Sequence, residues 1–220
     1  MGLTVETARA QAAFEESVDG FVAAVHGLDD YALLRHSRCH GWTRLDVVSH
    51  VVAGWHEMLC GLVTQVDEPP TVDAASYWIA FAEEVAAEDP VEVLMAQRRR
   101  SSVYLRPSSA CAQLTELAEA VQAGATNLPD RPCRWQGQVF LPGDFLAIWA
   151  VENVVHHLDL DLDRQVPARA LALARYTIEA LAGTPLPSSW SDRDAVLVGT
   201  GRAPVPDDAG GLADTFPVLQ

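Results

Sequence analysis

Lysine is missing from the chain, and all fifteen of its basic residues are arginine. Mechanisms in which a lysine amine attacks the substrate or forms a Schiff base are therefore excluded. Thirty acidic residues bring the net charge to −15, which argues against general nucleic-acid binding because phosphate contacts need a concentrated basic surface. The single basic cluster, Arg98-Arg99-Arg100, is short, and we expect it to be solvated or paired with nearby acids.

Cysteine is scarce and scattered. No two cysteines form a Cys-x-x-Cys pair, so neither a zinc knuckle nor a disulfide-rich secreted scaffold is predicted; they are Cys39, Cys60, Cys111 and Cys133. No apolar run reaches the length of about eighteen residues that spans a membrane. Residues 1–27 are charged and amphipathic, unlike a signal peptide. These absences predict a reduced, cytoplasmic protein without a membrane span.

Amphipathic helical patterns fill most of the chain. Apolar residues make up 49% and charged residues 20%, which is typical of a globular protein with one core. Thr43 and Asp46 form a capping-box pattern, and Asp89 precedes Pro90 at a first helical position. The predicted helices span about residues 4–25, 43–59, 74–87, 90–105, 108–121, 142–163 and 167–182. The sequence therefore predicts a mainly α fold.

Two segments lack helical periodicity. Residues 124–141 are rich in turn residues, and the alternation within Cys133 to Phe140 predicts a short hairpin. Residues 185–220 are rich in Pro, Gly and Asp and contain one strand candidate, Ala195 to Val198. Because this tail is too short for a core of its own, we expect it to pack on a bundle formed by residues 1–184.

The helix around residues 148–157 carries the most informative pair of polar residues. Glu152 and His156 are four apart and share one face, together with Trp149, while apolar residues occupy the other sides. A buried glutamate is costly unless it is paired, protonated or bound to a metal. An ordinary helix-surface hydrogen bond is the commoner explanation for such a pair, so the spacing alone is compatible with a metal without requiring one.

His50 lies on an earlier helix, toward its packed side. Val47, Val51 and Gly54 stand at the flanking three- and four-residue spacings. A core histidine bonded to a backbone carbonyl is one interpretation, and a metal ligand is the other. Two helices that each offer ligand groups favour the second, because two histidines and one glutamate form the ligand set of open catalytic zinc sites.

The neighbouring polar residues have weaker assignments. We expect His157, about 100° around the helix from His156, at the surface or an interface, and His56 to be structural. Asp159 either orients a ligand histidine or is an exposed carboxylate near a helix end. Glu57 either supports the site or has no role in it. Trp149 and Trp55 either line a pocket or belong to the core.

Two segments resemble the mycothiol-dependent maleylpyruvate isomerase family. The stretch GWTRLDVVSH, residues 41–50, resembles the first motif of that family, and ENVVHHLDL, residues 152–160, resembles its Glu-x3-His motif. The resemblance implies a DinB-like four-helix bundle that binds a divalent metal, usually zinc, through His50, Glu152 and His156. It also implies mycothiol as the thiol cofactor.

The tail and two departures qualify what the resemblance implies. Residues 198–204, VGTGRAP, are similar to the short ending of many family members, whereas His40 replaces the proline that commonly precedes the first motif. We expect the chain to be a short form without the C-terminal α/β domain of the isomerase. The bundle and the metal site are therefore expected to carry over, and the maleylpyruvate reaction is not.

The leading functional hypothesis is a metal- and thiol-dependent transferase or isomerase. A mycothiol thiolate would add to a small electrophile, with Zn²⁺ as the expected metal and Ni, Fe or Mn as alternatives. Arg202 is the candidate catalytic residue, because a guanidinium can hold a carboxylate of substrate or cofactor, and one of Arg98 to Arg100 is a further candidate. A non-catalytic binding module with a structural metal, which could include a homodimer, is one alternative. A thiol-independent metal hydrolase is the other.

Overall fold

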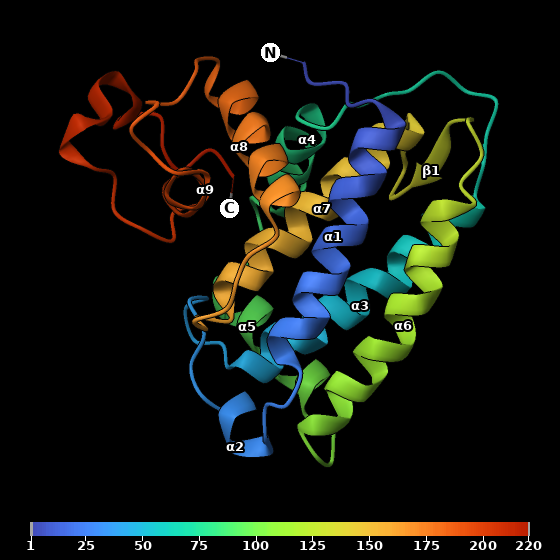
Figure 1. Ribbon diagram of the computed structural model, residues 1–220, viewed down its shortest axis with the longest axis vertical. Helices are drawn as coiled ribbons and strands as arrows, with labels where there is room; N and C mark the ends of the chain where they lie inside the picture. Colours follow the sequence, from blue (N-terminus) through green and yellow to red (C-terminus); the bar gives the residue numbers. More distant parts are fainter. Residues whose placement is uncertain (1, 220) are drawn as a thin grey trace.

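Four long helices form the core of the protein in its computed structural model, which describes residues 2–219. These are α1 (Thr7–Val25), α3 (Arg44–Val63), α6 (Ser108–Thr126) and α7 (Pro142–Asp159), which lie side by side in Figure 1. The shorter helices are α2 (Asp30–Leu33), α4 (Ser76–Val85), α5 (Pro90–Ser101), α8 (Ala168–Ala182) and α9 (Asp192–Gly199). Among the described residues, no helix is both long and apolar enough to cross a bilayer.

Helix α7 is the central helix of the bundle. It contacts α1, α3, α8 and α9, and all of its residues are buried except Glu152. An all-round apolar sequence produces this position, because such a helix reaches a low free energy only when every face is covered. The single half-exposed residue of the central helix is therefore a carboxylate.

The caps that the sequence indicates form as expected. Thr43 and Asp46 make a reciprocal capping box at the start of α3, and the Asp89 side chain accepts from two backbone N–H groups at the start of α5. Helix α7 ends at Asp159, a turn earlier than expected, because Asp161 has a positive φ (51°) that a right-handed helix does not accommodate, and arginines from elsewhere bind the carbonyls at its end. Arg38 Nε donates to the Leu158 carbonyl (3.1 Å), and Arg44 Nε donates to the Leu160 carbonyl (2.7 Å). These contacts fix the start of α3 against the end of α7.

The hairpin predicted between Cys133 and Phe140 is confirmed. Strands β1 (Cys133–Trp135) and β2 (Gln138–Phe140) pair antiparallel, with Cys133 opposite Phe140. The two connecting residues, Gln136 and Gly137, both have positive φ (46° and 74°), as a type I′ turn requires. This turn brings Trp135 and Gln136 over the surface of α3 and α7.

The strand expected at Ala195 to Val198 is wrong, since these residues lie inside α9. Ser191 caps that helix by accepting from the Asp194 N–H group, and its apolar residues pack against α8 and α7. A 3-10 helix, η1 (Asp207–Leu212), follows in the tail, which lies beside α8 in Figure 1.

Gly143, in the first turn of α7, provides a test of this packing. A Cβ atom there would lie 2.0 Å from the Val5 carbonyl oxygen and 3.0 Å from the Thr7 nitrogen. Glycine to alanine inside a helix ordinarily stabilises by about 0.5–1 kcal/mol. For Gly143→Ala we expect the opposite, a loss of at least about 2 kcal/mol in the free energy of unfolding, because backbone atoms cannot yield as a side chain can.

Urea denaturation followed by circular dichroism measures this loss. Gly211→Ala is the control, because nothing lies within 4 Å of a Cβ atom there, and its effect should stay within about 0.5 kcal/mol. Equal stability of the Gly143→Ala variant and the wild type would contradict the close approach of α7 to the residues preceding α1.

Candidate metal centre

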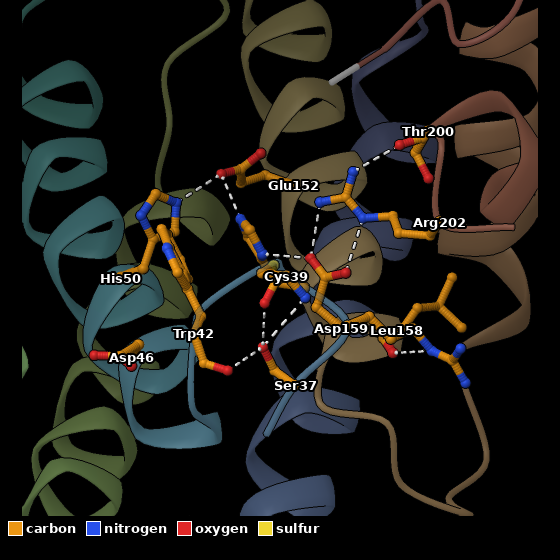
Figure 2. A network of polar contacts seen from close by, with 12 residues as sticks. Ser37, Cys39, Trp42, Asp46, His50, Glu152, Leu158, Asp159, Thr200 and Arg202 are labelled. Carbon is orange, nitrogen blue, oxygen red and sulfur yellow. Dashed lines mark hydrogen bonds and ion pairs between the residues drawn. The ribbon is translucent and has the colours of Figure 1, made fainter. Parts of the chain in front are cut away.

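The three residues expected as ligands come together between α3 and α7. His50 Nε2 lies 3.2 Å from Glu152 Oε1, and His156 Nε2 lies 3.1 Å from the same oxygen. One ligand atom from each residue lies within 4.8 Å of the other two. Figure 2 shows His50 and Glu152 facing each other across the gap between the helices. Two imidazole nitrogens and a carboxylate oxygen thus surround one small volume.

A polar strut sets the distance between these helices. Trp55 Nε1 of α3 donates to Asn153 Oδ1 (2.9 Å), and Asn153 Nδ2 donates to Ser17 Oγ of α1 (3.0 Å). All three side chains are buried, so each hydrogen bond avoids an unsatisfied polar group in the core. Trp55 therefore belongs to the core and acts as a support. It does not line the pocket beside Glu152.

Asp159 is the outer partner of His156. Its Oδ2 lies 3.0 Å from His156 Nδ1, and the carboxylate is fully buried. Arg202 grips Asp159 with two nitrogens, Nε to Oδ1 at 2.8 Å and Nη2 to Oδ2 at 2.9 Å, while Nη1 donates to the Thr200 carbonyl (Figure 2). Of the two assignments left open for Asp159, its contact with His156 excludes the exposed one. The bidentate face of Arg202 that was expected to hold a substrate carboxylate is occupied by Asp159.

Burial and charge act in opposite directions on the protonation of the centre. Burial lowers the pKa of His50, so this imidazole is neutral near pH 7. Burial alone would lower the pKa of His156 too, but Glu152 and Asp159 outweigh it and hold that pKa well above the usual range. Burial would raise the pKa of Glu152, but both histidines hold it below its usual range. A proton on His156 thus offsets the charge of the neighbouring carboxylates, and a dication that displaces this proton would place more positive charge at the same point.

A second group of possible ligands lies on the other side of His156. Cys39, His156 and Asp159 also offer atoms within 4.8 Å of one another, and Figure 2 shows Cys39 close to Asp159. A cation there would lie beside the guanidinium of Arg202, which is already paired with Asp159. Like charges at that distance repel, so the set of His50, Glu152 and His156 is the better cation site. The sequence reasoning did not single out Cys39.

Two further histidines, His157 and His56, do not belong to this centre. The prediction that His157 is at a surface or interface is wrong: it is 3% exposed, its ring edge meets Phe21, and burial lowers its pKa to about 4. Because α8 and α9 cover that side of α7, no face of the helix end reaches solvent. His56 is exposed on α3, where its Nδ1 donates to the Val52 carbonyl one turn earlier (2.8 Å).

A pocket of about 180 Å³ opens beside Glu152 and His50. Trp149 lines it, as the sequence analysis allowed. The other aromatic walls come from α4 and the hairpin and were not foreseen; they are Tyr77, Trp78, Phe81 and Trp135. Glu57 also lines the pocket and accepts a hydrogen bond from Gln136 Nε2 (3.1 Å). The centre therefore has one reachable side, which is largely aromatic.

Comparison with known proteins agrees with the fold. Two crystal structures of mycothiol-dependent maleylpyruvate isomerase, one of them of a mutant, superpose with a TM-score of 0.55 at 14% identity and cover 81% of this chain and 70% of theirs. The expected DinB-like helical bundle is confirmed. No curated protein matches the sequence. The family model for the mycothiol maleylpyruvate isomerase N-terminal domain matches residues 14–161. The chain therefore belongs to the family of this N-terminal domain.

Proposed function

We propose that the protein is a divalent-metal-dependent enzyme that uses a low-molecular-weight thiol, mycothiol by family membership, on a small electrophile. The observation that carries this proposal is the convergence of His50 Nε2, Glu152 Oε1 and His156 Nε2 beside a pocket that His50 and Glu152 line. The reduced form of such a thiol belongs to a reducing compartment, so we place the protein in the cytoplasm.

The donor set fits a divalent metal. Two imidazoles and one carboxylate suit zinc, and three protein ligands leave one position of a tetrahedral site for another molecule. His50 is neutral near pH 7 and so has a lone pair available. His156 would have to lose its proton to solvent before it could bind a dication. Zinc is the metal we propose, because a soft thiolate ligand favours Zn²⁺ among the divalent ions that this donor set accepts.

The chain's own residues orient these ligands. The carboxylate of Asp159 accepts from His156 Nδ1–H, so that loss of the Nε2 proton would leave a lone pair directed toward a metal held beside Glu152. Arg202 holds Asp159 in place, so we assign Arg202 a positioning role that acts through Asp159 and His156. A bound dication would lower the pKa of a coordinated thiol and keep the nucleophilic thiolate available at neutral pH.

The chemistry that follows is addition of sulfur to an electrophilic carbon. A thiolate held beside His50, Glu152 and His156 would supply the nucleophile for two kinds of reaction. Addition to a C=C bond conjugated with a carbonyl would move the π electrons to the carbonyl oxygen, and loss of the thiolate after rotation about the resulting single bond would give the other geometry. Attack on a carbon that bears a leaving group would transfer the sulfur, and the leaving group would depart with the electron pair of the broken bond.

A conjugation assay tests the proposed function. Zinc-loaded protein is incubated with mycothiol and the fluorogenic electrophile monochlorobimane, and metal content is measured by mass spectrometry. We expect conjugation that requires both metal and thiol, and we expect Glu152→Gln to lower metal affinity at least ~100-fold, more than the loss of an outer partner costs, and to abolish turnover. His56→Ala is the matched control on α3 and should change neither quantity.

Other results would contradict this proposal. If the Glu152→Gln variant retained its metal in full, Glu152 would not be a ligand and the proposed metal site would be wrong. A tightly bound metal without turnover across a panel of electrophiles would indicate a binding module, and hydrolysis without any thiol would indicate a metal hydrolase.

Asp159 gives a second prediction, on proton linkage. Because the pKa of His156 is raised, metal binding at pH 7 must displace about one proton, and apparent affinity should rise with pH until His156 is neutral without metal. Asp159→Asn removes an anion that supports this proton. We expect this variant to release less than one proton per metal and to bind metal roughly 10–100-fold more weakly.

Calorimetric titrations with zinc in buffers of different ionisation enthalpy count the released protons. Asp161→Asn is the control, because Asp161 pairs with Arg38 at the surface and does not contact His156. Proton release near zero by the wild type would argue against the role assigned to Asp159 as the partner of His156. So would a zinc affinity of the Asp159→Asn variant equal to that of the wild type. Circular dichroism of the metal-free variants checks that each one is folded.

A further inference from the structure

We propose that the pocket beside Glu152 is the binding site for the body of the electrophile, and that its natural substrate class is a small anionic compound with one aromatic ring or a branched apolar group. Arg100 is the residue assigned to the anionic group. This inference rests on the proposed function and specifies its substrate. We call the site the aromatic pocket and define it by Tyr77, Trp78, Phe81, Trp135 and Trp149.

The walls of the aromatic pocket select for an apolar body. Trp135 and Trp149 pack with ring centroids 4.9 Å apart, and Tyr77 joins Trp135 at 5.7 Å, so three rings form one continuous surface. Ala53 and Gly54 of α3 also line the pocket, and the lack of a side chain at Gly54 lets the ring of Trp149 pack against α3, since a Cβ atom there would lie 3.1 Å from that ring. The faces of Tyr77, Trp135 and Trp149 thus offer an apolar surface against which a flat group can lie.

The size of the aromatic pocket limits its occupant. An apolar cavity of roughly 150 Å³ holds one benzene molecule, and this pocket has about 180 Å³. A single ring or a comparable branched chain fits such a volume. Mycothiol is a sugar-linked cysteine derivative far larger than one ring, so its bulk must lie outside. The aromatic pocket is therefore assigned to the electrophile, next to the position where the thiol would react.

Arg100 is the permanent cation among the residues that line the aromatic pocket in the described chain. It is held in place although it lies at the surface, because Nη1 donates to Gln97 Oε1 (2.6 Å). Gln97 is 2% exposed, and its Nε2 donates to the Asp46 carbonyl (2.6 Å) and to Ser49 Oγ (2.8 Å). A buried amide anchored next to His50 thus restrains this guanidinium, which lowers the entropy lost when it binds an anion.

The acids of the aromatic pocket direct an anion toward Arg100. Glu152 lies at the metal centre, and Glu57 accepts from Gln136 at the hairpin. Both carboxylates would repel an anionic substituent placed beside them.

Binding of three matched probes to zinc-loaded protein without thiol tests the inference by calorimetry. The probes are trans-cinnamate, its neutral amide cinnamamide, and fumarate, which is anionic but lacks a ring. We expect cinnamate to bind at least ~10-fold more tightly than cinnamamide, since a charge-assisted hydrogen bond contributes about 1.5–3 kcal/mol. We expect a similar preference over fumarate, which has no ring to bury against the aromatic walls. Arg100→Gln should remove the preference over cinnamamide, and the matched control Arg99→Gln should retain it.

Ala53→Leu tests the pocket itself, because the added carbons would fill the space against Trp149. It should weaken cinnamate and cinnamamide alike by at least ~10-fold while metal content stays unchanged. Fumarate binding as tightly as cinnamate would overturn the assignment of the aromatic walls. Cinnamate binding that Arg100→Gln leaves unchanged would overturn the assignment of Arg100, for example because the carboxylate binds the metal directly.

The two proposals can fail separately. Thiol conjugation of monochlorobimane without any preference for cinnamate would leave the proposed function standing and overturn the aromatic pocket as its substrate site. Cinnamate binding as expected, with no thiol chemistry on any electrophile, would overturn the proposed function and leave an aromatic-anion binding site.

Discussion

The carboxylate of Glu152 is the point on which the arrangement of this protein depends. Glu152 is the single residue of α7 that is not buried, and its Oε1 lies between the rings of His50 and His156. A charge in that position is costly unless a positive partner is present, and the structure places two imidazoles beside it. The strut of Trp55, Asn153 and Ser17 keeps α3, α7 and α1 at the spacing that this contact needs. The packing of the core helices and the geometry of the candidate centre therefore depend on each other.

The C-terminal segment is coupled to the centre through a single chain of contacts. Arg202 follows α9 and binds Asp159, and Asp159 contacts His156. Because Asp159 is fully buried, removal of the guanidinium would leave this carboxylate with His156 as its remaining charged partner among the described residues. The tail thus reaches the centre through one side chain, the Arg202 guanidinium, whose positive charge matches the negative charge of Asp159. The aromatic pocket lies on the other side of Glu152, so the outer shell and the proposed substrate site approach the centre from different directions.

Local sequence information predicted much of this arrangement. Caps at Thr43 and Asp89 and the four-residue spacing of Glu152 and His156 depend on neighbours in the chain, and the structure has all three features. Errors arose where distant segments decide. Four apolar residues at 195–198 suit a strand or a buried helix equally, and the Ser191 cap was the signal for the helix. His157 is buried because α8 and α9 cover α7, which its own periodicity does not encode. Likewise, the aromatic pocket is assembled from α3, α4, α7 and a hairpin, and no single segment reveals the space between them.

The proposed function requires that His50, Glu152 and His156 hold a metal whose remaining position receives a thiolate. X-ray absorption spectroscopy at the zinc edge, on the zinc-loaded protein with and without mycothiol, distinguishes this arrangement from others. We expect only nitrogen and oxygen neighbours without thiol, and one sulfur at about 2.3 Å once mycothiol is added. A sulfur neighbour before the thiol is added would point to Cys39 as a ligand. Either that result or the absence of sulfur after addition would rule out the arrangement.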